Sequence, residues 1–230
     1  MVGSIRKAVA IAALACGVLH GVGFADPSHR YRNTASVCIH LTIADQLSGS
    51  ALNTVKDEAS RIWIRQGIAL TWTGPAAETC RAVVPIIFDA SELLKQGGRS
   101  SADALGLTVF LGRAQTIYVS APRAFKMLGQ TSAFDQAVAT QGERDYRGGL
   151  LIGRVVAHEL GHVLLTTTAH SQTGLMRPVF GLRDVLSTDS ATTELSPIET
   201  NRLAMRFSLI PLDSPSNERS VLARSDLAKR

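Results

Sequence analysis

Two histidines and a glutamate stand together in the stretch His158-Glu159-Leu160-Gly161-His162. In an α-helix, residues four apart lie about one turn apart on the same face, so both imidazoles can reach one metal ion. Histidine binds zinc in tetrahedral sites at about 2.0–2.1 Å. Glu159 is rotated about 100° from His158, so its carboxylate can stand beside the ion and take a proton from bound water. We therefore expect a zinc site with Glu159 as general base.

A catalytic zinc ion needs a third protein ligand and one position left open for water. His170 is the best candidate, because it follows His162 by eight residues and the β-branched threonines at 166–168 favour leaving the helix. Glu194 and Glu199 are alternative ligands, although Glu199 also fits the acidic position of a helix capping box. The sequence favours His170 and one zinc ion per chain.

The sequence Gly174-Leu175-Met176 follows, and its methionine lies six residues after His170. The order of a His-Glu-x-x-His motif, a third histidine and a methionine in a turn resembles the metzincin clan of zinc metallopeptidases. In that clan the methionine forms an apolar floor beneath the zinc, and the resemblance implies this role for Met176. It also implies that Glu159 is the catalytic base. The zinc ligands it implies are His158, His162 and His170.

The chain departs from the clan's pattern at the exit from the helix. His170 comes two residues late, and Leu165 stands where the clan has a glycine. We therefore expect this exit to be built differently from that of the clan.

Residues 1–25 have the pattern of a secretory signal peptide. Two basic residues, Arg6 and Lys7, precede an apolar run at 8–19, and small residues precede a cut before Asp26. The run is short and is followed by glycines, so we expect no stable membrane span after the signal is removed. We expect the mature protein to be secreted or periplasmic.

Three cysteines bear on this localisation. Cys16 lies within the signal segment and is an alternative lipidation site. Removal of the segment leaves Cys38 and Cys80, and an exported chain with two cysteines is expected to form one disulfide. The alternative is two buried thiols.

The 230 residues are 45% hydrophobic, which suits one folded domain and excludes a disordered chain. We expect a signal peptide at 1–25, a single catalytic domain at 26–210 and a polar, flexible tail at 211–230. The hydrophobic patterns predict five strands and three main helices, and a further helix near Pro122. The strands are expected at 36–43, 68–73, 82–88, 105–111 and 116–120, and the helices between Ser50 and Gly67, at 150–165 and at 197–207.

This order of elements predicts an α+β fold. We expect a mixed sheet of about five strands in mostly sequential order, with a backing helix, an active-site helix and a small C-terminal helical part. Gly129 and Gly142 are expected to interrupt the region before the active-site helix. The resemblance implies a zincin or metzincin-like version of this fold.

The formal charge is +5, and removal of Arg6 and Lys7 with the signal leaves +3, without a basic stripe. We therefore expect no nucleic-acid partner, and a monomer acting on a peptide or protein substrate bound along an edge strand within residues 105–120. The predicted function is an exported zinc metalloendopeptidase that uses zinc-activated water and Glu159. The alternatives are an exported, non-catalytic zinc-binding module and a zinc hydrolase of a non-peptide bond.

Overall fold

The computed structural model describes residues 30–42, 47–73, 83–88, 104–112, 114–129, 140–179, 187 and 189–212. The expected signal peptide, with Cys16, and most of the expected tail lie outside these residues, as does Cys80. Cys38 is buried and disulfide-bonded. Its pairing with Cys80 stays a prediction.

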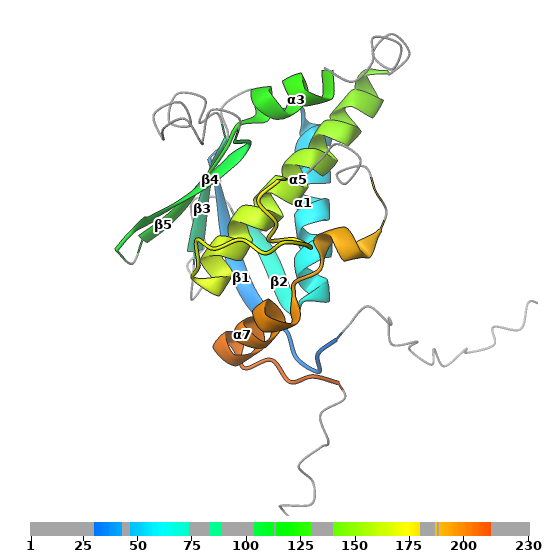
Figure 1. Cartoon of the computed structure of the whole chain (residues 1–230). Coiled ribbons are helices and arrows are strands. Elements are labelled where there is room, and N and C mark those ends of the chain that lie inside the picture. Colours follow the sequence, from blue (N-terminus) through cyan, green and yellow to red (C-terminus); the bar gives the residue numbers. More distant parts are fainter. Residues whose placement is uncertain are drawn as a thin grey trace, which may run out of the picture.

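A five-stranded mixed sheet forms one layer of the domain (Figure 1). Its strands are β1 (Ala35–Thr42), β2 (Ile68–Thr73), β3 (Val83–Phe88), β4 (Gly106–Leu111) and β5 (Ala114–Val119). The first three strands and β5 run parallel, whereas β4 forms an antiparallel hairpin with β5. Gly112 lies in the hairpin turn with φ +61°, a conformation that favours glycine. The predicted α+β class, mixed sheet and strand number are confirmed.

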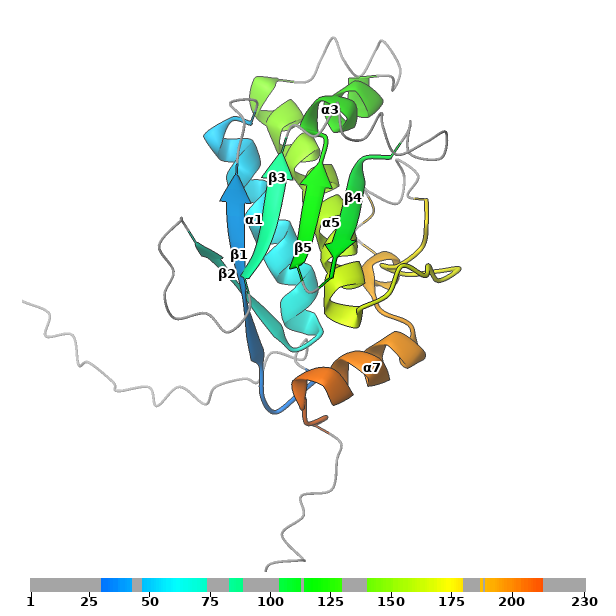
Figure 2. The same cartoon turned by 90° about the vertical axis from the view of Figure 1, so that its left-hand side faces the viewer.

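The expected sequential order of the strands is wrong. The order across the sheet is β2-β1-β3-β5-β4, so β1 lies between β2 and β3 (Figure 2). Parallel neighbours need a crossover connection, and a crossover can bring the next strand to either side of the previous one. The chain places β2 on one side of β1 and β3 on the other, which the hydrophobic pattern of the strands does not encode.

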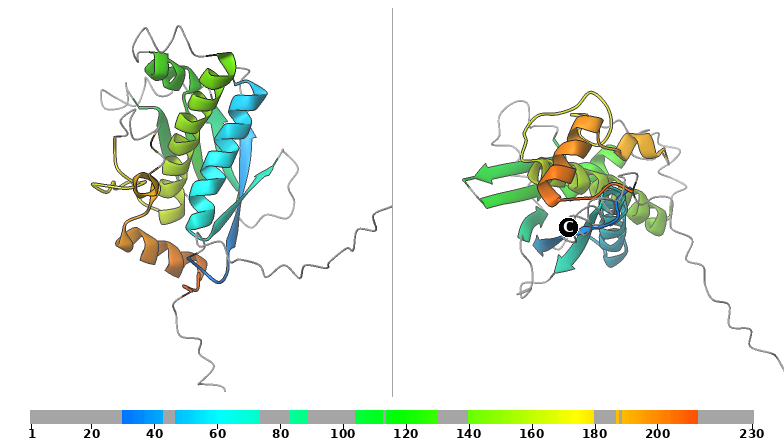
Figure 3. Two further views of the ribbon diagram at one scale, coloured as in Figure 1. Left: turned by 90° about the vertical axis from the view of Figure 1, so that its right-hand side faces the viewer. Right: turned by 90° about the horizontal axis from the view of Figure 1, so that it is seen from below.

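Two long helices lie side by side on one face of the sheet (Figure 3). They are α1 (Gly49–Arg65) and α5 (Gln141–Leu165). The shorter helices are α3 (Ala121–Gly129), the 3-10 helix η2 (Ser190–Thr193) and α7 (Pro197–Phe207). The core between sheet and helices includes the fully buried Ile39, Ile117 and Leu160. Ser48 caps the first turn of α1, two residues before the expected start of this helix at Ser50.

The expected interruption at Gly142 is wrong, because α5 is continuous from Gln141. Thr140 caps its start by accepting a hydrogen bond from the backbone N–H of Glu143 at 3.2 Å. The helix is long and apolar enough to cross a membrane by length and composition alone. However, 94% of the apolar window is buried inside the fold, which is typical of a core helix.

Two glycines let α5 approach α1 closely. A Cβ added at Gly149 would lie 2.8 Å from the carbonyl oxygen of Ala51, and one at Gly153 would lie 3.0 Å from that of Val55. These glycines therefore fix the spacing of the two helices, and the gain in packing outweighs their low helix propensity.

A buried ion-pair cluster crosses the same helix interface. Nε of Arg154 on α5 donates to Oε1 of Glu58 on α1 at 2.8 Å, and both side chains are at most 6% exposed. Arg61 donates to both oxygens of the same carboxylate at 2.8 Å. Burial alone would raise the pKa of Glu58, but the hydrogen bonds of the two arginines outweigh it and lower this pKa. Arg154 also donates to the carbonyl oxygen of Ser187 at 2.8 Å.

The two ends of the described chain meet beneath the sheet (Figure 1). The N–H of Arg32 donates to the carbonyl oxygen of Ile210 at 2.8 Å, and the N–H of Leu212 donates to that of Arg30 at 3.0 Å. Tyr31 and Pro211 form an antiparallel bridge between these bonds. The expected boundary between the catalytic domain and the tail, at residue 210, thus falls inside this pairing.

Candidate metal centre

His158 and His162 lie one turn apart on the buried C-terminal half of α5. Nδ1 of His158 is 2.8 Å from the carbonyl oxygen of Leu175, and Nδ1 of His162 is 2.8 Å from that of Thr167. Because a carbonyl oxygen only accepts, each Nδ1 must donate its hydrogen, and each Nε2 can then present its lone pair to a metal ion. Burial lowers the pKa of His158 to about 4 and also lowers that of His162, so both rings are neutral at pH 7.

The two Nε2 atoms face each other at a distance of 3.2 Å. Two nitrogens bound to one tetrahedral zinc ion, each at about 2.0–2.1 Å, stand about 3.3 Å apart. The observed distance therefore fits a shared ion. Two lone pairs facing each other without a hydrogen between them repel, and a cation between them would remove this repulsion.

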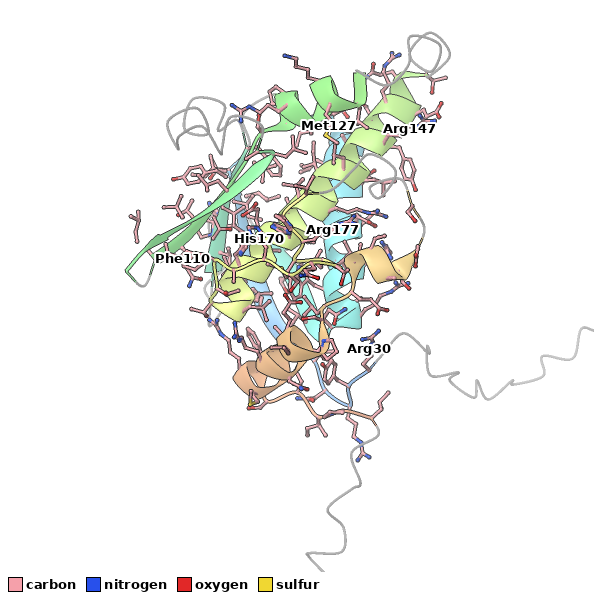
Figure 4. All side chains as sticks on the ribbon, viewed as in Figure 1. Arg30, Phe110, Met127, Arg147, His170 and Arg177 are labelled. Carbon is pink, nitrogen blue, oxygen red and sulfur yellow. The ribbon has the colours of Figure 1, made fainter. Side chains whose placement is uncertain are left out.

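His170 completes the group from the segment that follows α5 (Figure 4). Its ring stacks on that of His158 with centroids 5.3 Å apart and stands at 89° to that of His162 at 4.9 Å. The ligand atoms of the three histidines lie within 4.8 Å of one another, so the group could hold a metal ion. His158 and His162 are buried while His170 is exposed, which leaves the outer side of the group accessible.

As expected, the turn that ends α5 does not use a glycine at the end of the helix. Leu165 is the last helical residue, and Thr166 adopts the left-handed conformation with φ 49° and ψ 55°. The N–H of Thr166 donates to the carbonyl oxygen of Val163 at 3.2 Å, and that of Thr167 donates to that of His162 at 3.1 Å. These two bonds form a Schellman motif, which usually has glycine at the position of Thr166. The turn also orients His162, because Thr167 accepts its Nδ1 hydrogen.

Glu159 lies beside the histidines and faces the sheet. The hydroxyl of Thr108 on β4 lies 2.7 Å from Oε2 of Glu159 and 3.0 Å from its backbone oxygen, and it donates to them. A Cβ added at Gly106 would lie 2.7 Å from Oε1, so the absence of a side chain there makes room for the carboxylate. Burial raises the pKa of Glu159 to about 7, and the hydrogen bonds of Thr108 act in the opposite direction. Such a group can take up and return a proton near neutral pH.

Met176 packs directly under the histidine-bearing turn of α5. It is fully buried, and a Cβ at Gly161 would lie only 2.2 Å from its sulfur. The turn that carries it is held from both sides. Leu175 donates its N–H to the carbonyl oxygen of Glu194 at 2.8 Å, and Met176 accepts from the N–H of Ser171 at 2.8 Å. Met176 thus lies against the turn between His158 and His162, and Gly161 provides the space for it.

The carboxylates of the two alternative ligands have other partners. Glu194 forms an ion pair with Arg30 at 2.7 Å. Glu199 accepts from the N–H of Ser196 at 2.8 Å, as the capping box predicted, and also from the hydroxyl of Ser171. The metal-binding group found among the described residues contains neither glutamate.

Sequence reasoning missed Thr108, which is a polar residue in the apolar strand Gly-Leu-Thr-Val-Phe-Leu. That break in the pattern was the available signal, but the partner of Thr108 lies 51 residues away in the chain. No family model and no curated protein matches this sequence. The interpretation of the site therefore depends on its residues and geometry.

Proposed function

We propose that this chain is an exported zinc-dependent metallopeptidase with a metzincin-like catalytic domain. The observation that carries the proposal is the convergence of three histidines beside a buried carboxyl group whose pKa is about 7. Three imidazoles are a ligand set typical of catalytic zinc sites. The buried methionine beneath the histidines supports the resemblance to the metzincins.

Zinc bound to the three histidines would act as a Lewis acid toward a peptide carbonyl and lower the pKa of water to about 7. Glu159 then serves as general base and takes the proton of the attacking water. It returns this proton to the leaving amine. The hydroxyl of Thr108 holds one carboxylate oxygen and so orients the group.

Strand β4 is a suitable docking site for an extended substrate. It is an edge strand of the described sheet. One of its edges pairs with β5, and the opposite edge is free of strands in the described part. Because Gly106 and Thr108 on this strand contact Glu159, a peptide that adds to the free edge passes close to the base. Main-chain hydrogen bonds of this kind favour peptide substrates over small non-peptide ones. The signal-like residues 1–25 support secretion or a periplasmic location, and we propose a monomer.

The experiment compares the purified wild-type protein with Glu159→Ala. We expect about one zinc ion in each protein, because Glu159 does not ligate. Turnover of a denatured protein substrate should fall by at least about 10²-fold in the variant, since a general base contributes 10²–10⁴-fold. Zinc binding without any wild-type turnover would instead favour the non-catalytic module, and turnover of esters alone would favour a hydrolase of another bond.

A further inference from the structure

Helix α7 contacts both ends of the loop that carries His170. We call residues 166–171 the His170 loop. Glu199, near the N-terminus of α7, contacts the end of this loop, and Arg206, near the C-terminus of α7, contacts its beginning. Glu199 is 28 positions from Ser171 in the chain, and Arg206 is 40 positions from Thr166.

The end of the loop is fixed at Ser171, directly after the third histidine. Its hydroxyl donates to Oε1 of Glu199, and its N–H donates to the carbonyl oxygen of Met176 at 2.8 Å. Oε2 of Glu199 accepts from the N–H of Ser196 at 2.8 Å. Glu199 as a whole is only 9% exposed, so its carboxylate joins the helix cap to the loop with little competition from water.

The beginning of the loop is fixed at the C-terminus of α5. Nη1 of Arg206 contacts the carbonyl oxygens of Val163 at 3.1 Å and Leu164 at 3.0 Å, and also the hydroxyl of Thr166. Both carbonyls lie in the last turn of α5, where the regular bond to the residue four positions on is missing, and a cation there interacts favourably with the helix dipole. The contact stabilises the left-handed conformation of Thr166, which is unfavourable for a residue other than glycine.

Glu199 and Arg206 are seven residues apart, which is two helical turns, so they lie on the same face of α7. Leu203 lies between them on this face and is fully buried. One rigid helix therefore sets the distance between the two ends of the loop. Each contact alone would fix one end, whereas the pair restricts the position of the histidine between them.

We propose that α7 positions the third metal ligand, with Glu199 and Arg206 as positioning residues that hold the His170 loop ready for the ion. The proposal rests on the metal site of the proposed function and not on peptide hydrolysis. It predicts that the contacts made by α7 determine metal affinity, because a loop already held in place loses little freedom when the ion binds.

The test uses two variants, each with a matched control on the same structure. Ser171→Ala removes the hydroxyl that binds Glu199 but leaves the helix cap, whereas Ser196→Ala weakens the cap but leaves Ser171 in place. Arg206→Gln removes the charged contact to α5, whereas Arg202→Gln removes an exposed charge from the same helix. Zinc affinity is measured by competition with a chromogenic chelator, and thermal stability is measured on the metal-free proteins.

We expect Ser171→Ala and Arg206→Gln to weaken zinc binding by about 10- to 100-fold, as loss of groups that orient metal ligands does. Both controls should bind zinc like the wild type, and Ser171→Thr should restore the affinity because it keeps the hydroxyl. Unchanged zinc affinity in Ser171→Ala and Arg206→Gln would overturn the proposal. So would a loss of affinity that follows the loss of metal-free stability equally in variants and controls. A wild-type protein that binds no zinc would refute the proposed function itself, which separates the two failures.

Discussion

Replacement of Thr108 by valine removes one hydroxyl and keeps the shape of the side chain. In the wild type this hydroxyl donates to the Glu159 carboxylate at 2.7 Å. A hydrogen bond to a charged group contributes about 1.5–3 kcal/mol, and it stabilises the ionised form of the base. Its loss should therefore raise the pKa of Glu159, which burial already raises to about 7. Since 1.36 kcal/mol corresponds to one pKa unit, the acidic limb of the pH–activity profile should move up by about 1–2 pH units.

The assay follows kcat/KM on a fluorogenic peptide from acidic to alkaline pH, with the zinc content determined for each protein. A general base works only when it is deprotonated, so Thr108→Val should lose activity at neutral pH and recover it at alkaline pH. Thr108→Ser keeps the donor and should behave like the wild type. Zinc content should be equal in the wild type, Thr108→Val and Thr108→Ser, because the hydroxyl of Thr108 binds Glu159 and not the three histidines. An acidic limb that stays in place in Thr108→Val would refute this account of the base.

Three further predictions concern the scaffold and the third ligand. Glu58→Ala leaves the charge of Arg154 buried without its carboxylate and should lower the free energy of unfolding by about 3–5 kcal/mol, as measured by urea denaturation followed through tryptophan emission. Because the pKa of Glu58 is lowered in the fold, the stabilisation should be present above its ordinary value and vanish as the pH falls through the folded value; an equal pH dependence in Glu58→Ala and wild type would contradict this. Gly149→Val should push α1 and α5 apart and cost about 1–3 kcal/mol or more, whereas a melting temperature like that of the wild type would show that the helices can yield. His170→Ala should lose most of its zinc while its circular dichroism stays that of the wild type; retained zinc would exclude His170 as the third ligand.

The residues of the site could be predicted wherever helix geometry alone places them. The four-residue spacing of His158 and His162 brings their rings together in any regular helix, and the structure shows their Nε2 atoms 3.2 Å apart. His170 and Met176 were found through the resemblance and through their nearness in the chain. The capping box of Ser196 and Glu199 also formed as predicted, because all its contacts are local.

The parts that escaped prediction depend on contacts between distant segments. Gly142 suggested a break, yet α5 starts at Gln141 and continues through it, and the glycines at 149 and 153 pack this helix against α1. The position of β1 between two later strands depends on the direction of crossovers, which hydrophobic alternation does not specify. The second role of Glu199, as acceptor for Ser171, likewise requires knowing where α7 lies.

The pairing of residues 30–32 with 210–212 brings the two ends of the described chain side by side. A short linker could join these two strands of backbone, and the chain could be opened instead at the exposed hairpin turn of Gly112, far from the histidines in sequence. Neighbouring ends of this kind make circular permutation and insertion into a loop of another protein feasible. The candidate metal centre could then be inserted into another protein as a unit whose two attachment points lie next to each other.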